Sequence, residues 1–234
     1  MEKYRNEFRI LSSDTDMYQR LRLSRLFILL QEAAIAHTEA LGAGREKTLD
    51  RGILWAVALQ QVDVKRLPVY DEKVTLFSWP GETMHVLFPR YTRLCDEKGN
   101  VLIEASALWI LMDAKTRARV FPEETGIELP GMDSEGIALP RALRMSTGET
   151  ALFTVPYSYI DLHGHMNNAC LPDLAEDMMP EDLRTGTIIR IEAEYTGEIR
   201  AGDQLNLHME RVGKVFTFAA CMEKPMMKLR MEYA

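Results

Sequence analysis

LRLSRLFILLQEAAIAHTEAL, residues 21–41, predicts one long helix, and this helix decides the fold. The stretch is rich in Leu and Ala, which favour the helical backbone, and it contains neither Gly nor Pro. Gly42 and Gly44, which follow it directly, are helix stop signals. Because apolar residues occur around much of its circumference, we expect other structure to wrap around this helix.

The segment from Trp55 to Met112 predicts an antiparallel sheet. Residues 74–79 alternate between two faces in the manner of a strand, and residues 101–112 form a long, largely apolar run. The sequence DEKGN at 96–100 is a hairpin signal that joins this run to the strand before it.

A change of composition then divides the chain. Residues 121–140 (FPEETGIELPGMDSEGIALP) are dominated by Pro, Gly, Ser and acidic residues, which is typical of a surface connection. We therefore expect an N-terminal domain over 1–125, a linker over 126–149 and a C-terminal domain over 150–234. The second half repeats the order of the first, with a strand, a helix and three further strands predicted at 152–155, 168–183, 187–195, 204–211 and 215–222.

The two halves also match residue by residue. Residues 16–21 align with 161–166 at an offset of 145, and residues 69–74 align with 200–205 at an offset of 131. A helix inside a curling antiparallel sheet, present twice, is similar to the hot-dog architecture. The predicted fold class is therefore α+β, a tandem (double) hot-dog with two antiparallel sheets, each wrapped around a central helix and joined edge to edge.

Composition excludes several classes of protein. A formal net charge of -7 and a pI near 5.4 do not supply the basic face that nucleic acids require. The three cysteines are widely spaced and lack a C-x-x-C pair, which favours a reducing compartment, so we expect a cytoplasmic protein. Neither a signal peptide nor a run of about 20 apolar residues is present, so no membrane association is expected.

The segment richest in chemistry is PYSYIDLHGHMNN at 156–168. Its Asp-x-His-x-His pattern is similar to the metal-binding strand of amidohydrolases, which are barrels of about 250 residues with further ligands on later strands. Only 69 residues follow His165, and His208 is the single histidine among them. We therefore expect neither a metal nor a cofactor.

A longer pattern favours a different family. Three features together resemble the acyl-acyl carrier protein (acyl-ACP) thioesterases of plants and bacteria. They are the string D-x-x-x-H-x-N-N, a helix with an acidic residue followed three positions later by Pro, and a strand with E-Y-x-x-E. The resemblance covers nearly the whole chain, including Trp55 and residues 62–80. In one departure, His163 stands where the family has Asn. The matching residues are Asp161, His165, Asn167, Asn168, Asp177, Pro180, Glu194, Tyr195 and Glu198.

The resemblance implies hydrolysis of fatty acyl-ACP thioesters, with release of free fatty acid in fatty acid biosynthesis and ACP as the partner. It assigns Asp161 and Glu198 to the attacking water, His165 to proton transfer and His163 to a hydrogen bond in place of the family's Asn. Asn167 and Asn168 would adjoin the substrate. The predicted helix starts at Asn168 as its N-cap, so free N–H groups there could stabilise the oxyanion.

The internal repeat predicts one site per chain. At the positions that match Asp161, His163, His165 and Glu198, the first half carries four residues of which only the aspartate is the same, which leaves this half free to house the acyl chain. These residues are Asp16, Tyr18, Arg20 and Leu67.

Several alternatives stay open from the sequence. An acyl-CoA thioesterase, or a hot-dog protein that binds acyl thioesters without hydrolysing them, would carry a similar motif. Arg20, Arg22 and Arg25 are candidates for docking the acidic ACP, as are Arg141 and Arg144 in the linker. Two hot-dogs in one chain already form the usual pair, so a homodimer is not required.

Overall fold

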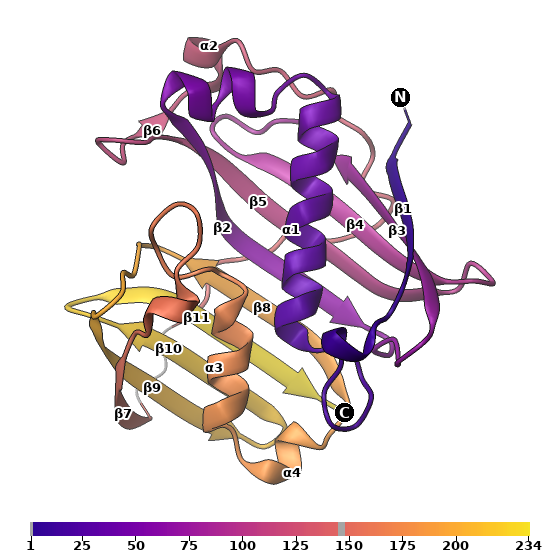
Figure 1. The fold of residues 1–234 in the computed structure, drawn as a ribbon, viewed down its shortest axis with the longest axis vertical. Coiled ribbons are helices and arrows are strands. Elements are labelled where there is room, and N and C mark those ends of the chain that lie inside the picture. The colour runs from indigo at the N-terminus through magenta and orange to yellow at the C-terminus, as the bar shows by residue number, and fades with distance from the viewer. Residues whose placement is uncertain (1, 145–147) are drawn as a thin grey trace.

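The computed structural model describes residues 2–144 and 148–234. The strands form one antiparallel sheet in the order β1-β3-β4-β5-β2-β8-β11-β10-β9-β7, with β6 paired to β5. Helices α1 and α3 lie on the same face of this sheet (Figure 1). The strands are β1 (Tyr4–Arg9), β2 (Ile53–Val64), β3 (Lys73–Pro80), β4 (Phe88–Asp96), β5 (Val101–Asp113), β6 (Arg119–Val120), β7 (Glu149–Thr154), β8 (Ile188–Tyr195), β9 (Gln204–Val212), β10 (Val215–Cys221) and β11 (Pro225–Tyr233). The helices are α1 (Leu23–Ala40), α2 (Pro122–Thr125), α3 (Cys170–Met178) and α4 (Glu181–Arg184).

The first helix forms where the sequence predicts it. Its buried residues recur at helical spacing, from Leu23 through Leu26, Phe27 and Leu30, and pack on the first-half strands. The sheet covers this face of α1, whereas Ile35 on another face is 49% exposed. The helix is therefore cradled by the sheet on one side and is not enclosed all round.

The two halves join through β2 and β8. The predicted two sheets are thus the two halves of one continuous sheet, in which β1, β3, β4, β5 and β2 correspond in order to β7, β9, β10, β11 and β8. Across the junction, Gln60 faces Ala193 and Val62 faces Ile191. An offset of 131 interchanges these two pairs, so a local two-fold axis runs between β2 and β8. This pairing removes one exposed edge from each half.

The second helix is shorter than predicted. It was expected over 168–183, but α3 ends at Met178 and a separate turn, α4, follows Pro180. Proline has no N–H to donate and disfavours helical backbone in the residue before it, and Met179 is extended, with φ -81° and ψ 145°. Three strands, β1, β6 and β11, were not predicted.

The linker crosses the sheet face opposite α1. Ile137 packs on Trp79 and Tyr91, whose side chains point away from the helices. The indole N–H of Trp79 donates to Asp133 O at 2.9 Å, and the hydroxyl of Ser106 donates to Ala138 O at 2.6 Å. The linker therefore forms a cover over the first half. Residues 145–147 of the expected 126–149 linker lie outside the described residues.

A buried carboxyl group between the halves makes stability depend on pH. Burial raises the pKa of Glu176 in α3 to about 7. At a pH between the ordinary carboxyl pKa and this raised pKa, the Glu176 carboxylate therefore takes up a proton when the protein folds. Stability therefore falls as the pH rises through this window. We expect Glu176→Gln to raise the free energy of unfolding at pH 8 by up to about 3 kcal/mol and much less at pH 5. Denaturant titrations at the two pH values measure this, and an equal effect at both would contradict it.

No helix among the described residues combines the length and apolar character needed to cross a lipid bilayer.

Candidate active site

The motif loop, residues 156–169, connects β7 to α3 and is folded by Asp161. The backbone N–H of His163 donates to Asp161 Oδ1 at 2.8 Å, and the backbone N–H of Asp161 donates to His165 O at 3.0 Å. Gly164 takes φ 80°, a left-handed conformation that strains any residue with a Cβ atom. The loop thus returns on itself and carries Asp161 and His165 on one side.

Asp161, His165 and Glu198 converge, as the motif spacing predicts. His165 Nδ1 lies 3.8 Å from Asp161 Oδ1, and His165 Nε2 lies 3.8 Å from Glu198 Oε1. Their side chains are 17–27% exposed, so reactants can reach them. Both separations are longer than a direct hydrogen bond, as is common in unliganded active sites. The arrangement places an imidazole between two carboxylates.

Arg117 from the first half completes this cluster. Its Nε lies 3.1 Å from Glu198 Oε1. The β5–β6 turn presents it: Asp113 Oδ1 accepts the N–H groups of Lys115 and Thr116, and Arg117 takes φ 60°. Arg117 Nη1 is buried with no hydrogen-bond partner among the described residues. A cationic donor is therefore held beside Asp161, His165 and Glu198.

The sequence alone did not identify Arg117, because nothing in the residues of the turn points to Glu198. The turn signal Asp113-Ala114-Lys115-Thr116 was visible, but its position opposite Glu198 depends on the pairing of β2 with β8. The local two-fold axis brings this end of β5 to the motif of the other half.

Cys170 follows the motif loop and is a thiol at neutral pH. Burial raises its pKa to about 11, with smaller contributions from Asp173 and Asp161. Because the thiolate is the nucleophilic form, Cys170 is unsuited to attack a thioester.

The other predicted motif residues have varied positions. The exposed ring of His163 stacks on that of His165, with centroids 5.7 Å apart, and its assigned hydrogen bond to substrate stays a prediction. Asn167 Oδ1 accepts the N–H of Ala169 at 2.9 Å. The prediction that Asn168 is the N-cap is wrong, because α3 begins at Cys170.

The backbone donors expected at the start of α3 are already bonded. The N–H groups of Cys170 and Leu171 donate to Asn167 O and Asn168 O, and the Ala169 N–H is held by the Asn167 side chain. These three N–H groups are therefore occupied within the turn, and the assignment of Asn167 and Asn168 to the substrate stays a prediction.

The remaining motif residues of the second half support the site. Glu194 Oε2 accepts the Leu143 N–H at 2.6 Å and lies 3.1 Å from Lys228 Nζ, so it ties the linker to the sheet. The hydroxyl of Tyr195 approaches Asn168 O at 3.5 Å. Asp177 is exposed on α3.

The first half carries the same loop without the same chemistry. The N–H of Asp16 donates to Arg20 O as that of Asp161 does to His165 O, and the N–H of Leu21 donates to Pro68 O as that of Met166 does to Ile199 O. The residues that form these equivalent hydrogen bonds are related by the offsets of 145 and 131. By the second offset, Leu67 is the first-half residue equivalent to Glu198.

Arg20 holds the two halves together at this second loop. It pairs with Asp16 at 2.9 Å, and its Nη1 donates to Gly186 O at 3.1 Å. Arg25 pairs with the buried Asp14 at 2.9 Å, while Arg22 is exposed. Arg20 also donates to Arg184 O at 3.1 Å, beyond the end of α3. Arg22 lies nearer the start of that helix: burial raises the pKa of Asp173, in the first turn of α3, and the charge of Arg22 opposes this rise. The role of these three arginines in docking stays a prediction, as does that of the exposed linker residues Arg141 and Arg144.

Within residues 2–144 and 148–234, no group of three or more His, Cys, Asp or Glu residues is arranged to hold a metal ion.

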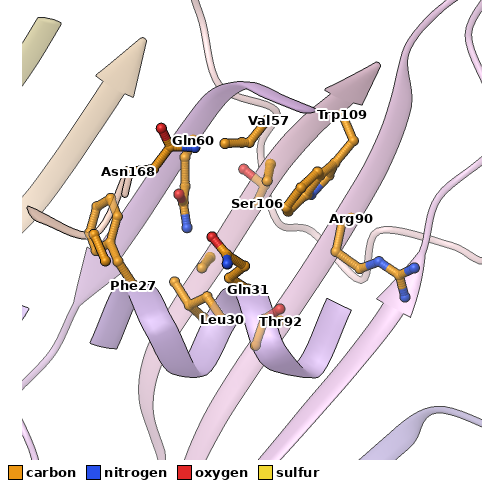
Figure 2. Close-up of a pocket in the computed structure, with 13 residues that line it drawn as sticks. Phe27, Leu30, Gln31, Val57, Gln60, Arg90, Thr92, Ser106, Trp109 and Asn168 are labelled. Atoms are coloured by element: carbon orange, nitrogen blue, oxygen red, sulfur yellow. The ribbon is translucent and has the colours of Figure 1, made fainter. Parts of the chain in front are cut away.

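A cavity lies between α1 and the first-half sheet and reaches the motif loop through Asn168 and Ala169 (Figure 2). The space between its walls is about 410 Å³, a volume that includes open solvent, so the site is a solvent-filled recess and not a closed cavity. Helix α1 supplies Phe27, Leu30 and Gln31 to its wall, and strands β2, β4 and β5 supply the remainder apart from the two motif-loop residues.

Two family models match this chain. The acyl-ACP thioesterase N-terminal domain matches residues 1–125, and the acyl-ACP thioesterase C-terminal domain matches residues 144–231. Among curated relatives, the chloroplastic acyl-(acyl-carrier-protein) hydrolase FATB2 of Cuphea viscosissima is 25% identical over 213 residues, covering 83% of this chain and 52% of its own length. A chloroplastic palmitoyl-acyl carrier protein thioesterase of Cuphea hookeriana is 24% identical and covers 83% of this chain and 51% of its own length. The chain thus spans about half the length of these relatives.

Solved structures share the fold over almost the whole chain. An acyl-ACP thioesterase from Bacteroides thetaiotaomicron has a TM-score of 0.87 at 20% identity, covering 98% of this chain and 97% of that one. A 12:0-ACP thioesterase from Umbellularia californica has a TM-score of 0.83 at 20% identity, covering 99% and 97%. The tandem hot-dog architecture is thereby confirmed. The two family models together span both halves, and the chain belongs to the acyl-ACP thioesterase family.

Proposed function

We propose that this chain hydrolyses fatty acyl-ACP thioesters and releases free fatty acid. The observation that carries the proposal is the convergence of Asp161, His165 and Glu198, with Arg117 alongside. A carboxylate, an imidazole and a guanidinium meet the three needs of the reaction: a base for the water, a proton carrier and a stabiliser of developing negative charge.

The proposed reaction needs only water as co-reactant. Glu198 and Asp161 orient a water molecule, and Glu198 accepts its proton as the water oxygen attacks the thioester carbonyl carbon; the proton then passes to His165. His165 carries the proton to the departing sulfur as the C–S bond breaks, so the products are a carboxylic acid and a free thiol. Arg117 Nη1, which is buried without a partner among the described residues, is placed to donate to an anionic oxygen.

The cavity of Figure 2 supports a place for the acyl chain in the first half. It begins beside the motif loop at Asn168 and runs under α1, where Phe27 and Leu30 give it apolar walls. The second half has the shorter helix, with 9 residues in α3 against 18 in α1. One reacting cluster and one acyl cavity per chain are therefore proposed.

The partner and the compartment are part of the same proposal. The names of the curated relatives support ACP as the carrier of the substrate. The three thiols of Cys95, Cys170 and Cys221 are free, as in proteins of reducing compartments, which supports a cytoplasmic location.

A thiol-release assay tests the function. We expect turnover of acyl-ACP with a higher kcat/KM than acyl-CoA of the same chain length, and Asp161→Ala serves as the inactive control. Faster turnover of acyl-CoA would identify an acyl-CoA thioesterase. Binding of both thioesters without release of thiol would identify a protein that binds acyl thioesters and does not hydrolyse them.

A further inference from the structure

The cavity beside the motif loop has hydrogen-bonding groups inside it. Gln31 of α1 and Gln60 of β2 direct their carboxamides into the space between helix and sheet (Figure 2). Ala105 and Ala107 on β5 are small and leave this space open. In the unliganded protein water can reach both amides, and a plain hydrocarbon chain in this cavity would cover them without replacing their hydrogen bonds to water.

These groups are not used by the protein itself. No side-chain hydrogen bond joins Gln31 or Gln60 to another residue of the described ranges, and the indole Nε1 of Trp109, which lines the same cavity, is buried without a partner among them. Gln61, the next residue along β2, differs from Gln60 because its side chain has a hydrogen-bond partner in the protein. It lies on the opposite face and donates to Asp63 Oδ2 at 2.8 Å.

A buried cation adds positive potential to the wall of the cavity. The guanidinium of Arg90 is 5% exposed, lies 2.9 Å from His37 Nδ1 and donates to Thr38 Oγ1 at 2.7 Å. Burial lowers the pKa of His37 to about 4, so this neighbour is neutral at pH 7. No carboxylate in the described part of the chain pairs with Arg90. The guanidinium is directed away from Gln31 and Gln60 (Figure 2), so its positive charge acts on an electronegative atom in the cavity only at a distance.

We infer that the acyl chain accepted by this cavity carries an oxygen, as a hydroxyl or keto group, which hydrogen-bonds to Gln31, Gln60 and Trp109. This inference rests on the proposed function for its reaction and adds the class of acyl chain. Sites built to bond a hydroxyl reject the analogue that lacks it, because their buried polar groups are then left unpaired. The alternating placement of Gln60 and Gln61 on opposite faces of β2 makes the inference testable by a matched pair of variants.

The test compares thioesters of one chain length: decanoyl, 3-hydroxydecanoyl and 10-hydroxydecanoyl. Wild-type enzyme is expected to show a kcat/KM about five- to tenfold higher for one of the hydroxylated chains than for decanoyl, the gain typical of one neutral hydrogen bond. Gln60→Met keeps the side-chain length but removes the amide, and should bring this ratio close to one. Gln61→Met should leave the ratio unchanged.

The inference fails if the wild type favours decanoyl or does not discriminate. It also fails if Gln60→Met slows all three substrates equally, since Gln60 would then act on the thioester or its carrier arm. Calorimetric measurement of the binding of the free acids to the Asp161→Ala variant separates a failure of this inference from a failure of the proposed function. Tighter binding of a hydroxylated acid, with no hydrolysis of any thioester by the wild type, would support the inference and overturn the proposed hydrolase function. Equal binding of all the acids would overturn the inference even if the wild type hydrolyses thioesters.

Discussion

Replacing Glu198 by Gln is expected to lower kcat/KM for acyl-ACP by about 100- to 10 000-fold, the range typical of losing a general base. The amide keeps the shape of the side chain but cannot accept the proton of the attacking water. Asp161→Asn and His165→Ala should cause losses of the same order, because His165 lies 3.8 Å from each carboxylate and the three groups act together. Steady-state thiol release measures the effect.

The internal repeat supplies the matched control. Asp16→Asn makes the same change in the loop of the first half, where Asp16 pairs with Arg20 and Leu67 stands in place of Glu198. This variant should lose stability between the halves while keeping the specific activity of its folded fraction. Near-normal rates in all three second-half variants, each with a native circular dichroism spectrum, would rule out the proposed cluster.

Arg117→Ala is the second change with a large expected effect, a fall of about 10- to 100-fold in kcat. The guanidinium lies 3.1 Å from Glu198 Oε1, and removing it takes away both a charge-assisted hydrogen bond and the positive charge beside the reacting groups. Because Arg117 belongs to the β5–β6 turn, its loss should leave the acyl cavity intact. The decrease should therefore appear in kcat with a much smaller change in KM.

Two further variants make the role of Arg117 specific. Arg117→Lys keeps the charge but not the planar guanidinium, and it should restore part of the rate. Arg119, exposed two residues along the same turn, is the control, and Arg119→Ala should leave kcat unchanged. Equal kinetics for the wild type and Arg117→Ala would show that Glu198 works without this partner.

Strong local signals explain why much of the fold could be predicted. Leu and Ala run through α1 without a break and Gly residues follow it, so its prediction over 21–41 differs from Leu23–Ala40 by two residues at the start and one at the end. The strand β11 was missed although its signal was present. Met227, Leu229 and Met231 are buried and alternate with polar residues, and such alternation is typical of a strand.

The boundaries of α3 were predicted wrongly because the preference of single residues was outweighed by a neighbouring residue. Asn168 has the residue type of an N-cap, but Asn167 Oδ1 accepts the Ala169 N–H first and shifts the start of α3 to Cys170. The extension of this helix to 183 overlooked Pro180, which separates α3 from α4. Helix boundaries depend on single bonds of this kind, whereas the existence of a helix depends on many residues.

The sequence by itself determined that the fold occurs twice, that the candidate acid–base residues are in the second copy, and that Asp161 and His165 share one loop. These features depend on residue type and on spacing within a segment, and both can be read along the chain. Only the tertiary structure decided that Arg117 meets Glu198, that Arg20 joins the halves and that Gln31 faces Gln60. Each of these contacts joins residues far apart in the chain through the β2–β8 junction or the packing of α1 on the sheet, and the register of such packing is set by the burial of many side chains together.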